Sequence, residues 1–171
     1  MDMKWIGALF LIIASTSIGL YISNQFEKRP KHIRQLESAL QLLEAEITYS
    51  QIPLQMAFER IAAHLPHPMK EFFSALSEEM AREKDFMEVW NREVDRLAVW
   101  TSLKTNEIEI MRQFGNSLGQ HDIIQQQKQI RLALTHLNRE MEEARDEHYK
   151  YSKLARSLGV LLGVFLAILL V

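Results

Sequence analysis

The chain has 171 residues, no cysteine and a formal net charge of -2 at neutral pH. Its length suits one domain, and its near-neutral charge gives no electrostatic reason to expect a nucleic-acid partner. The absence of cysteine excludes disulfides, thiol nucleophiles, Cys-ligated metals and lipidated cysteines. Apolar residues make up 47% of the chain, an ordinary fraction, but they form long runs at the two ends while the middle is charged.

The first apolar run, WIGALFLIIASTSIGLYI, extends from Trp5 to Ile22 without a charged residue. As a helix of about 18 residues it would measure ~27 Å, close to the ~30 Å hydrocarbon core of a bilayer. Trp5 and Tyr21 lie near its ends, where such rings favour the headgroup layer. The run exceeds the apolar region of a signal peptide, and a basic segment follows it. We therefore predict an N-terminal transmembrane helix within residues 1–27.

Residues 28–153 are predicted to form a cytoplasmic helical domain. Apolar residues recur there at spacings of three and four, and no stretch alternates as a strand does. Pro30 suits the first turn of a helix, Pro66 and Pro68 disfavour continued helix, and Asp85 can cap a helix start. Before the last long helix, the predicted helices cover residues 30–49, 53–65, 69–80, 86–97 and 103–115.

The last predicted helix is the longest. From Ile123 to Leu158, apolar residues follow steps of four and three, which is a heptad pattern with two polar interruptions. No proline or glycine occurs from Gln120 to Leu158. We predict a helix of about 50 residues, ~75 Å long, running from near Asp122 into the second apolar run. Whether it bends at the membrane is left open.

The second apolar run, residues 154–171, predicts a C-terminal transmembrane helix. Small residues recur there every fourth position and would let another helix approach closely. An equally weighted alternative is that glycine and alanine are simply common in membrane helices. The packing partner could be the first span, a second copy or another protein. The candidate packing residues are Ala155, Gly159, Gly163 and Ala167.

The positions of the basic residues predict the orientation. Lysines and arginines cluster at 28–34, after the first apolar run, and at 150–156, around the start of the second. Because basic residues stay on the cytoplasmic side, the middle segment should be cytoplasmic and both termini should lie across the membrane.

The only two glycines between the apolar runs occur in QFGNSLGQHD. The segment has neither the lysine nor the preceding strand of a phosphate-binding loop. The helix could end at Gly115, with Asp122 capping the next one. Ser117 is a competing cap, and a third alternative is one helix continuing through Gly115 and Gly119. A turn between packed helices is favoured over a protein-binding elbow, and catalysis is the least favoured function.

No motif for chemistry stands out. The six histidines form no known ligand spacing. Glu44 and Glu46 are two residues apart, so a helix would place them on different faces, which is poor geometry for acid–base work. We expect a non-enzymatic protein without cofactor or metal. A membrane-bound enzyme using histidine and glutamate is the least favoured alternative.

Two segments resemble a known family. EKRPKHIRQLESALQLLEAEITYSQIPL and EIEIMRQFGNSLGQHDIIQQQKQI resemble the stage III sporulation protein AB family of endospore-forming bacteria. The resemblance covers nearly the whole chain, including both apolar runs. It implies membership of the channel complex that links the mother cell to the engulfed forespore. It also implies a distant similarity to the inner-membrane platform proteins of type II secretion and type IV pilus machines, and contact with a cytoplasmic ATPase.

Together these observations predict an all-α fold: a cytosolic bundle of about five to six helices between N- and C-terminal transmembrane helices. The expected function is a membrane scaffold of the sporulation channel complex in the mother-cell membrane that faces the forespore. The alternative is a membrane tether or coiled-coil homo-oligomer unrelated to secretion. The candidate partner-binding residues are Phe114, Gly115, Leu118, Gly119 and Asp122.

Overall fold

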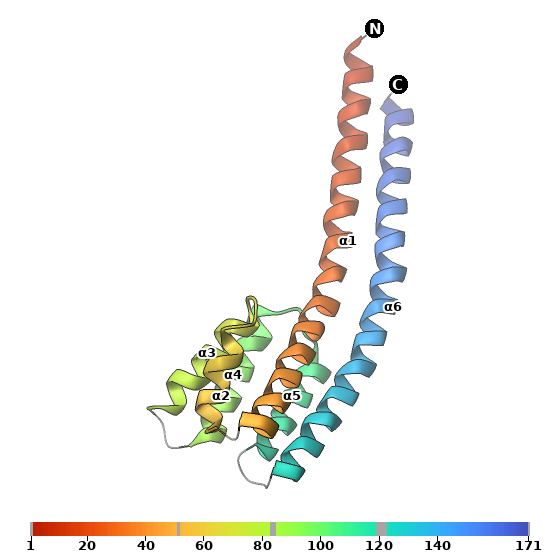
Figure 1. Cartoon of the computed structure of the whole chain (residues 1–171). Helices are drawn as coiled ribbons and strands as arrows, with labels where there is room; N and C mark the ends of the chain where they lie inside the picture. The colour runs from red at the N-terminus through yellow and green to blue at the C-terminus, as the bar shows by residue number, and fades with distance from the viewer. Residues whose placement is uncertain (1, 51, 83–84, 119–122, 171) are drawn as a thin grey trace. The chain divides into compact units, whose positions relative to one another are not determined.

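All regular elements that the computed structural model describes are helices (Figure 1). The described residues are 2–50, 52–82, 85–118 and 123–170; in α1 the side chains of 2–9, 11–12, 19–20 and 22–26, and in α6 those of 156, 159, 166 and 169–170, are outside the description. The prediction of an all-α fold is confirmed. The elements are α1 (Asp2–Ala45), the π-helix η1 (Glu46–Ser50), α2 (Leu54–Ala62), α3 (Met69–Met80), α4 (Phe86–Trp100), α5 (Thr105–Ser117) and α6 (Ile123–Leu170).

The chain forms two compact units. Residues 1–30 and 143–171 make up one, here called the paired-helix unit, and residues 31–142 make up the other, called the bundle. Helices α1 and α6 each contribute one part to each unit. The domain boundaries predicted from the sequence, after residues 27 and 153, stay predictions.

Helix α1 continues through Pro30, so the prediction that a new helix begins there is wrong. A proline inside a helix loses one backbone hydrogen bond and crowds the preceding turn. The helix persists because tertiary contacts hold the turns on both sides. Arg29 forms ion pairs on one side, and Ile33 and Leu36 are fully buried on the other.

The short helices of the bundle begin and end close to the predicted positions. The two prolines at 66 and 68 separate α2 from α3, as expected. Asp85 caps α4, because its carboxylate accepts hydrogen bonds from the backbone N–H of Met87 at 2.9 Å and of Glu88 at 3.4 Å. The predicted cap is therefore confirmed, and such a cap satisfies N–H groups that a helix start leaves unpaired.

Helix α5 passes through Gly115 and ends at Ser117. Leu118 has an extended backbone, with φ of -74° and ψ of 136°. The alternatives of a helix end at Gly115 and of one helix through both glycines are therefore wrong. Ser117 is the last residue of α5 and is followed by the extended Leu118, so the alternative in which Ser117 caps the next helix is also wrong. Gly119 and Asp122 lie outside the described residues, so a cap at Asp122 stays a prediction.

Helix α6 is a single helix of 48 residues. It is continuous up to Leu158, as the absence of proline and glycine there predicted, and it also continues through Gly159 and Gly163. Its heptad positions Ile130, Leu137 and Met141 are buried and form part of the bundle core. Within the bundle it lies against α1, where the guanidinium Nε of Arg131 donates to Glu44 Oε1 at 2.9 Å. The buried heptad face thus packs against the chain's own helices in this part of α6.

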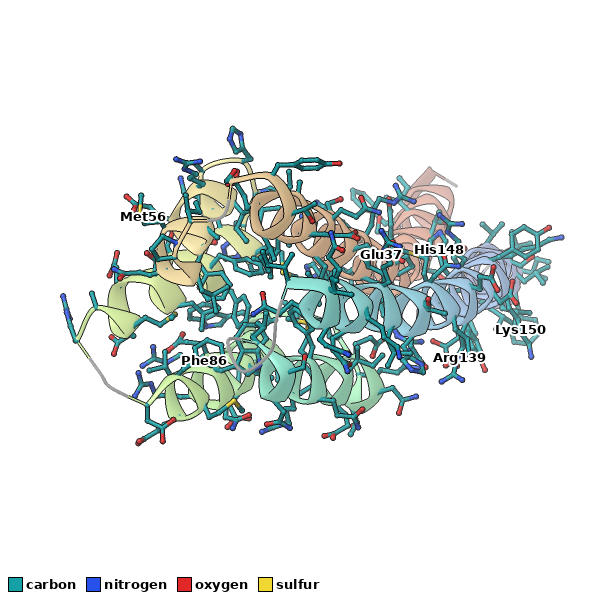
Figure 2. All side chains as sticks on the ribbon, turned by 60° about the horizontal axis from the view of Figure 1, so that its bottom comes forward. Glu37, Met56, Phe86, Arg139, His148 and Lys150 are labelled. Atoms are coloured by element: carbon teal, nitrogen blue, oxygen red, sulfur yellow. The ribbon has the colours of Figure 1, made fainter. Side chains whose placement is uncertain are left out.

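The bundle core is aliphatic on α1 and α6 and aromatic around α3 and α4. Consecutive helices α2, α3, α4 and α5 pack as neighbours, and their side chains fill the space between them (Figure 2). Met56 points outward from α2 in the same view and is exposed. The largest fully buried side chains are Trp90, Phe58, Phe72, Phe73, Ile33, Leu36, Leu40, Leu43, Ile61, Met69, Leu76 and Leu97.

Within the described residues, no helix holds a stretch that is both long enough and apolar enough to cross a bilayer. The side chain of Trp5 and much of the first apolar run lie outside that description. The two predicted transmembrane helices therefore stay predictions.

Candidate partner-binding surface

The packing of Trp90 explains why residue 115 is a glycine. The Trp90 indole is fully buried, and its N–H donates to the carbonyl oxygen of Met111 at 2.8 Å. A Cβ atom at Gly115 would overlap the indole Cδ1 and Nε1 and would lie 2.7 Å from Cε2. The absence of a side chain at 115 therefore lets α5 approach the face of Trp90 on α4.

An aromatic cluster fixes the indole from its other sides. Its ring centroid lies 5.6 Å from that of Phe72 and 5.8 Å from that of Phe114, both in edge-to-face geometry, and 5.8 Å from that of Phe86. Such geometries are favourable for aromatic pairs. Because Trp90 is held by a hydrogen bond and several rings, it has little freedom to move away from a larger residue at 115.

Three of the five candidate partner-binding residues are buried in the bundle. Phe114, Gly115 and Leu118 lie in its core, and Gly119 and Asp122 are outside the described residues. A partner would therefore meet their exposed neighbours. In this segment these are Gln113 and Asn116 on α5 and the first two residues of α6.

The start of α6 exposes two apolar residues that are not among the predicted partner-binding residues. Ile124 is 74% exposed and Ile123 is 41% exposed. They lie at the end of the bundle where η1 finishes, since Gln127 Nε2 donates to Thr48 Oγ1 at 2.6 Å. We call Asn116, Ile123 and Ile124 the η1-end surface.

Three buried glutamates in the bundle have structural partners. Glu107 accepts a hydrogen bond from the backbone N–H of Lys104 at 2.8 Å and so caps α5. Glu93 pairs with Arg96 at 2.8 Å, and Glu140 accepts from the side-chain amide of Asn106 at 3.3 Å. Buried carboxylates need such partners to offset their desolvation.

The described residues contain no group of three or more histidine, aspartate or glutamate side chains placed to hold a metal ion. A groove of about 260 Å³ lies between α5 and α6. Its lining is chiefly amide and ionic, with Gln113 and His136 among the lining residues. Neither its shape nor its lining singles out a reacting group.

His67 and Glu71 form an exposed pair one helical turn apart, with Nδ1 and Oε2 separated by 3.1 Å. Partial desolvation alone would raise the pKa of the Glu71 carboxyl. Hydrogen bonds from its own backbone N–H and from His67 outweigh it and hold that pKa below its ordinary value of 4.5.

In the paired-helix unit, one arginine links the two helices. Arg29 on α1 is only 6% exposed, and its guanidinium lies 2.8 Å from Glu147 and 3.4 Å from Glu143 on α6. Because the two carboxylates remain partly exposed, the charged groups keep some hydration while the arginine is buried. A charge-assisted hydrogen bond between Arg29 and Glu147 therefore links the two helices of this unit.

Small residues are buried where the two helices of this unit run side by side (Figure 1). Ser15 on α1 and Gly163 and Ala167 on α6 are buried, while Ala155 is half-buried. The burial of Gly159 lies outside the description. Packing of the stripe against other membrane helices stays a prediction.

The protein is all-α: its first and last helices, α1 and α6, each contribute to both the helical bundle and the paired-helix unit. The chain belongs to the stage III sporulation protein AB family, whose sequence pattern it matches over residues 4–171. It is 41% identical to the stage III sporulation protein AB of Bacillus subtilis (strain 168) over 169 residues, covering 98% of this chain and 99% of the relative.

A solved structure of a stage III sporulation protein AB has the same fold. The TM-score is 0.66 at 42% sequence identity, over 71% of this chain and 96% of the solved chain. The resemblance inferred from the two quoted segments is therefore confirmed, and a role in sporulation follows from family membership.

Proposed function

We propose that the protein is a membrane-anchored scaffold of the mother cell–forespore channel complex. In this proposal the two apolar runs span the mother-cell membrane that faces the forespore, and the bundle is cytoplasmic. The supporting observation is the continuity of α1 and α6, each of which runs from an apolar run into the bundle core without a break. A flexible anchor would have a loop at that position.

The scaffold would present the η1-end surface to a cytoplasmic ATPase. Ile123 and Ile124 are exposed apolar residues at the start of α6, and Asn116 near the end of α5 is exposed and polar; a mixture of apolar and polar residues is the composition expected of a contact with another protein. The buried Phe114, Gly115 and Leu118 would support this surface from below. No catalytic step by this chain is part of the proposal.

The test is co-purification of the ATPase and of the channel proteins with the full chain from sporulating cells. Ile124→Glu should reduce recovery of the ATPase while the chain stays in the membrane fraction. Leu132→Glu is the matched control, because Leu132 is also an exposed apolar residue of α6. Unchanged recovery of every partner with Ile124→Glu would refute this assignment of the surface.

Topology can be tested separately because the chain has no cysteine of its own. Single cysteines replacing Asp2, Tyr49 and Val171 would be labelled in intact cells with a membrane-impermeant reagent. Positions 2 and 171 should react and position 49 should be protected. Labelling at 49 would refute a cytoplasmic bundle.

A homo-oligomeric tether is the second candidate, and one observation favours it. The heptad positions Tyr151 and Leu158 are 43% and 62% exposed, so another copy could cover them. Leu158→Cys should then form a disulfide-linked dimer in membranes under oxidation, and Val160→Cys should not, because Val160 is exposed but lies two positions on and so on the opposite face of α6. A Leu158→Cys chain that remains monomeric would refute the tether.

A further inference from the structure

The α4–α5 turn, residues 101–104, is attached to α1 through one of its backbone N–H groups. The other three N–H groups of the turn form hydrogen bonds within α4, the turn itself and α5, and they belong to Thr101, Leu103 and Lys104. The N–H of Ser102 instead donates to Nδ1 of His32 at 3.0 Å, and His32 lies on α1, 70 positions earlier in the chain. Both residues are half-buried. This contact therefore ties the turn to a helix far away in the sequence.

The connection between α2 and α3 is attached to the same face of α1. Gln35 Nε2 donates to the carbonyl oxygen of His67, which lies in this connection, at 3.4 Å. Because His32 and Gln35 are three residues apart on one helix, they lie on one face of it. One face of α1 thus holds two connections of the bundle, one through an imidazole that can take up a proton and one through an amide that cannot.

The contact with Ser102 requires one protonation state of His32. A backbone N–H can only donate, so Nδ1 has to accept and carries no hydrogen. Protonation makes both ring nitrogens donors, which sets the Nδ1 hydrogen against that of the Ser102 amide. An imidazole ordinarily titrates at about pH 6.5. The contact is therefore compatible with pH values above this range and is lost as the pH falls below it.

Charged groups of both signs occur on the elements next to the turn. Glu107 accepts from the backbone N–H of Lys104, and Glu140 accepts from the side chain of Asn106. Because cations and carboxylates are both present, local charge alone does not select one state of His32, whereas the hydrogen bond from Ser102 selects the neutral ring. The charged residues are Lys28 and Arg29 one turn before His32 on α1, Glu93 and Arg96 on α4, Lys104 on the turn, Glu107 on α5 and Glu140 on α6.

We propose that His32 is a pH-sensitive latch between α1 and the α4–α5 turn. With a neutral ring the latch is closed and Ser102 is bound to α1. With a protonated ring it is open, and the turn is held only by its bonds within α4 and α5. Gln35 keeps the α2–α3 connection attached in both states. The latch lies within the bundle, so the proposal does not depend on the membrane anchor.

The test is hydrogen–deuterium exchange of the full chain in detergent, followed by mass spectrometry, at about pH 5 and about pH 8, on either side of the range in which an imidazole ordinarily titrates. A peptide that contains Ser102 should lose protection at the lower pH by about two- to tenfold beyond the change in intrinsic exchange. In His32→Asn, which keeps an acceptor oxygen but cannot take up a proton, protection should be equal at both pH values. His32→Ala should lack this protection at both. Residues 108–114 of α5 are the internal control and should keep their protection throughout.

Nitrogen NMR of the imidazoles in the natural chain gives a measurement that needs no variant. At about pH 8 the Nδ1 of His32 should carry no hydrogen, and Nε2 should carry it. A hydrogen on Nδ1 at that pH would overturn the proposal, as would equal protection of Ser102 at the two pH values in the natural chain. An equal loss of protection in His32→Asn would assign the pH dependence to another group and would also overturn it. If His32→Asn does not fold, the two measurements on the natural chain decide.

Discussion

Gly115→Ala should destabilise the bundle although alanine is the better helix former. A Cβ at 115 would overlap the buried indole of Trp90, which Phe72, Phe86 and Phe114 surround and the Met111 carbonyl holds. Overpacking of this kind costs ~1–3 kcal/mol, and loss of the indole hydrogen bond adds ~0.5–1.5 kcal/mol. The propensity gain of ~1 kcal/mol offsets part of this. The expected net loss is about 1–3 kcal/mol.

Thermal unfolding of the full chain in detergent, followed by near-ultraviolet circular dichroism, measures this loss. For a chain of this size, each kcal/mol should lower the melting temperature by ~2–4 °C. Asn116→Ala is the matched control, because Asn116 is the exposed neighbour on the same helix and should change stability by less than ~0.5 kcal/mol.

A second background tests the physical reason. Trp90→Phe removes the five-membered ring that a Cβ at 115 would meet, so Gly115→Ala should cost less there than in the natural chain, with a coupling of ~0.5–3 kcal/mol. If Gly115→Ala causes no loss of stability in either the natural chain or the Trp90→Phe chain, the contact with Trp90 does not explain why residue 115 is a glycine. If the cost is the same in both backgrounds, the destabilisation has another source.

Three further predictions test the other contacts. Asp85→Ala should lower the stability of the bundle by ~1 kcal/mol, whereas Asp85→Asn, which keeps the capping oxygen, should cost little in the same melts. Arg29→Ala should increase amide hydrogen exchange in the α6 part of the paired-helix unit, and Glu143→Gln should have the smaller effect because its contact is longer. His67→Ala should move the pKa of Glu71 upward in an NMR titration. Because the pKa of Glu71 is depressed in the folded protein, the pair stabilises the fold above pH ~4.5. Its contribution is lost as the pH falls through the pKa of the folded state. Exchange or titration curves that match the natural chain would refute the respective contact.

The sequence predicted the helices well where a local signal defines an end. Pro66 and Pro68 break the chain through backbone chemistry alone, and the Asp85 carboxylate is placed by its position before a helix, so both features were predictable. The continuity of α6 up to Leu158 followed from the absence of proline and glycine in that stretch. The helix start predicted at Pro30 was wrong because a proline can either start a helix or be tolerated inside one, and tertiary contacts decide between the two.

The candidate site was predictable only as a segment. Gly115 was noticeable because glycine is rare between the apolar runs. The structural reason for a glycine there is the indole of Trp90, which lies 25 positions earlier and could not be inferred from the sequence around residue 115. The sequence pattern therefore indicated Phe114 and Leu118, which are buried, and did not indicate Ile124, which is exposed. Helical periodicity shows that one face is apolar, but it does not show which apolar residues at a helix end remain uncovered.

The contrasting environments of two tryptophans give the bundle intrinsic optical reporters. Trp90 is sealed among aromatic rings, and Trp100, ten residues later on the same helix, is partly in water. Loosening of the interior would shift the fluorescence emission of Trp90 to longer wavelengths, while an event confined to the surface would change only the emission of Trp100. With Trp5 replaced by phenylalanine, emission spectra alone would separate core opening from surface contact without any attached dye.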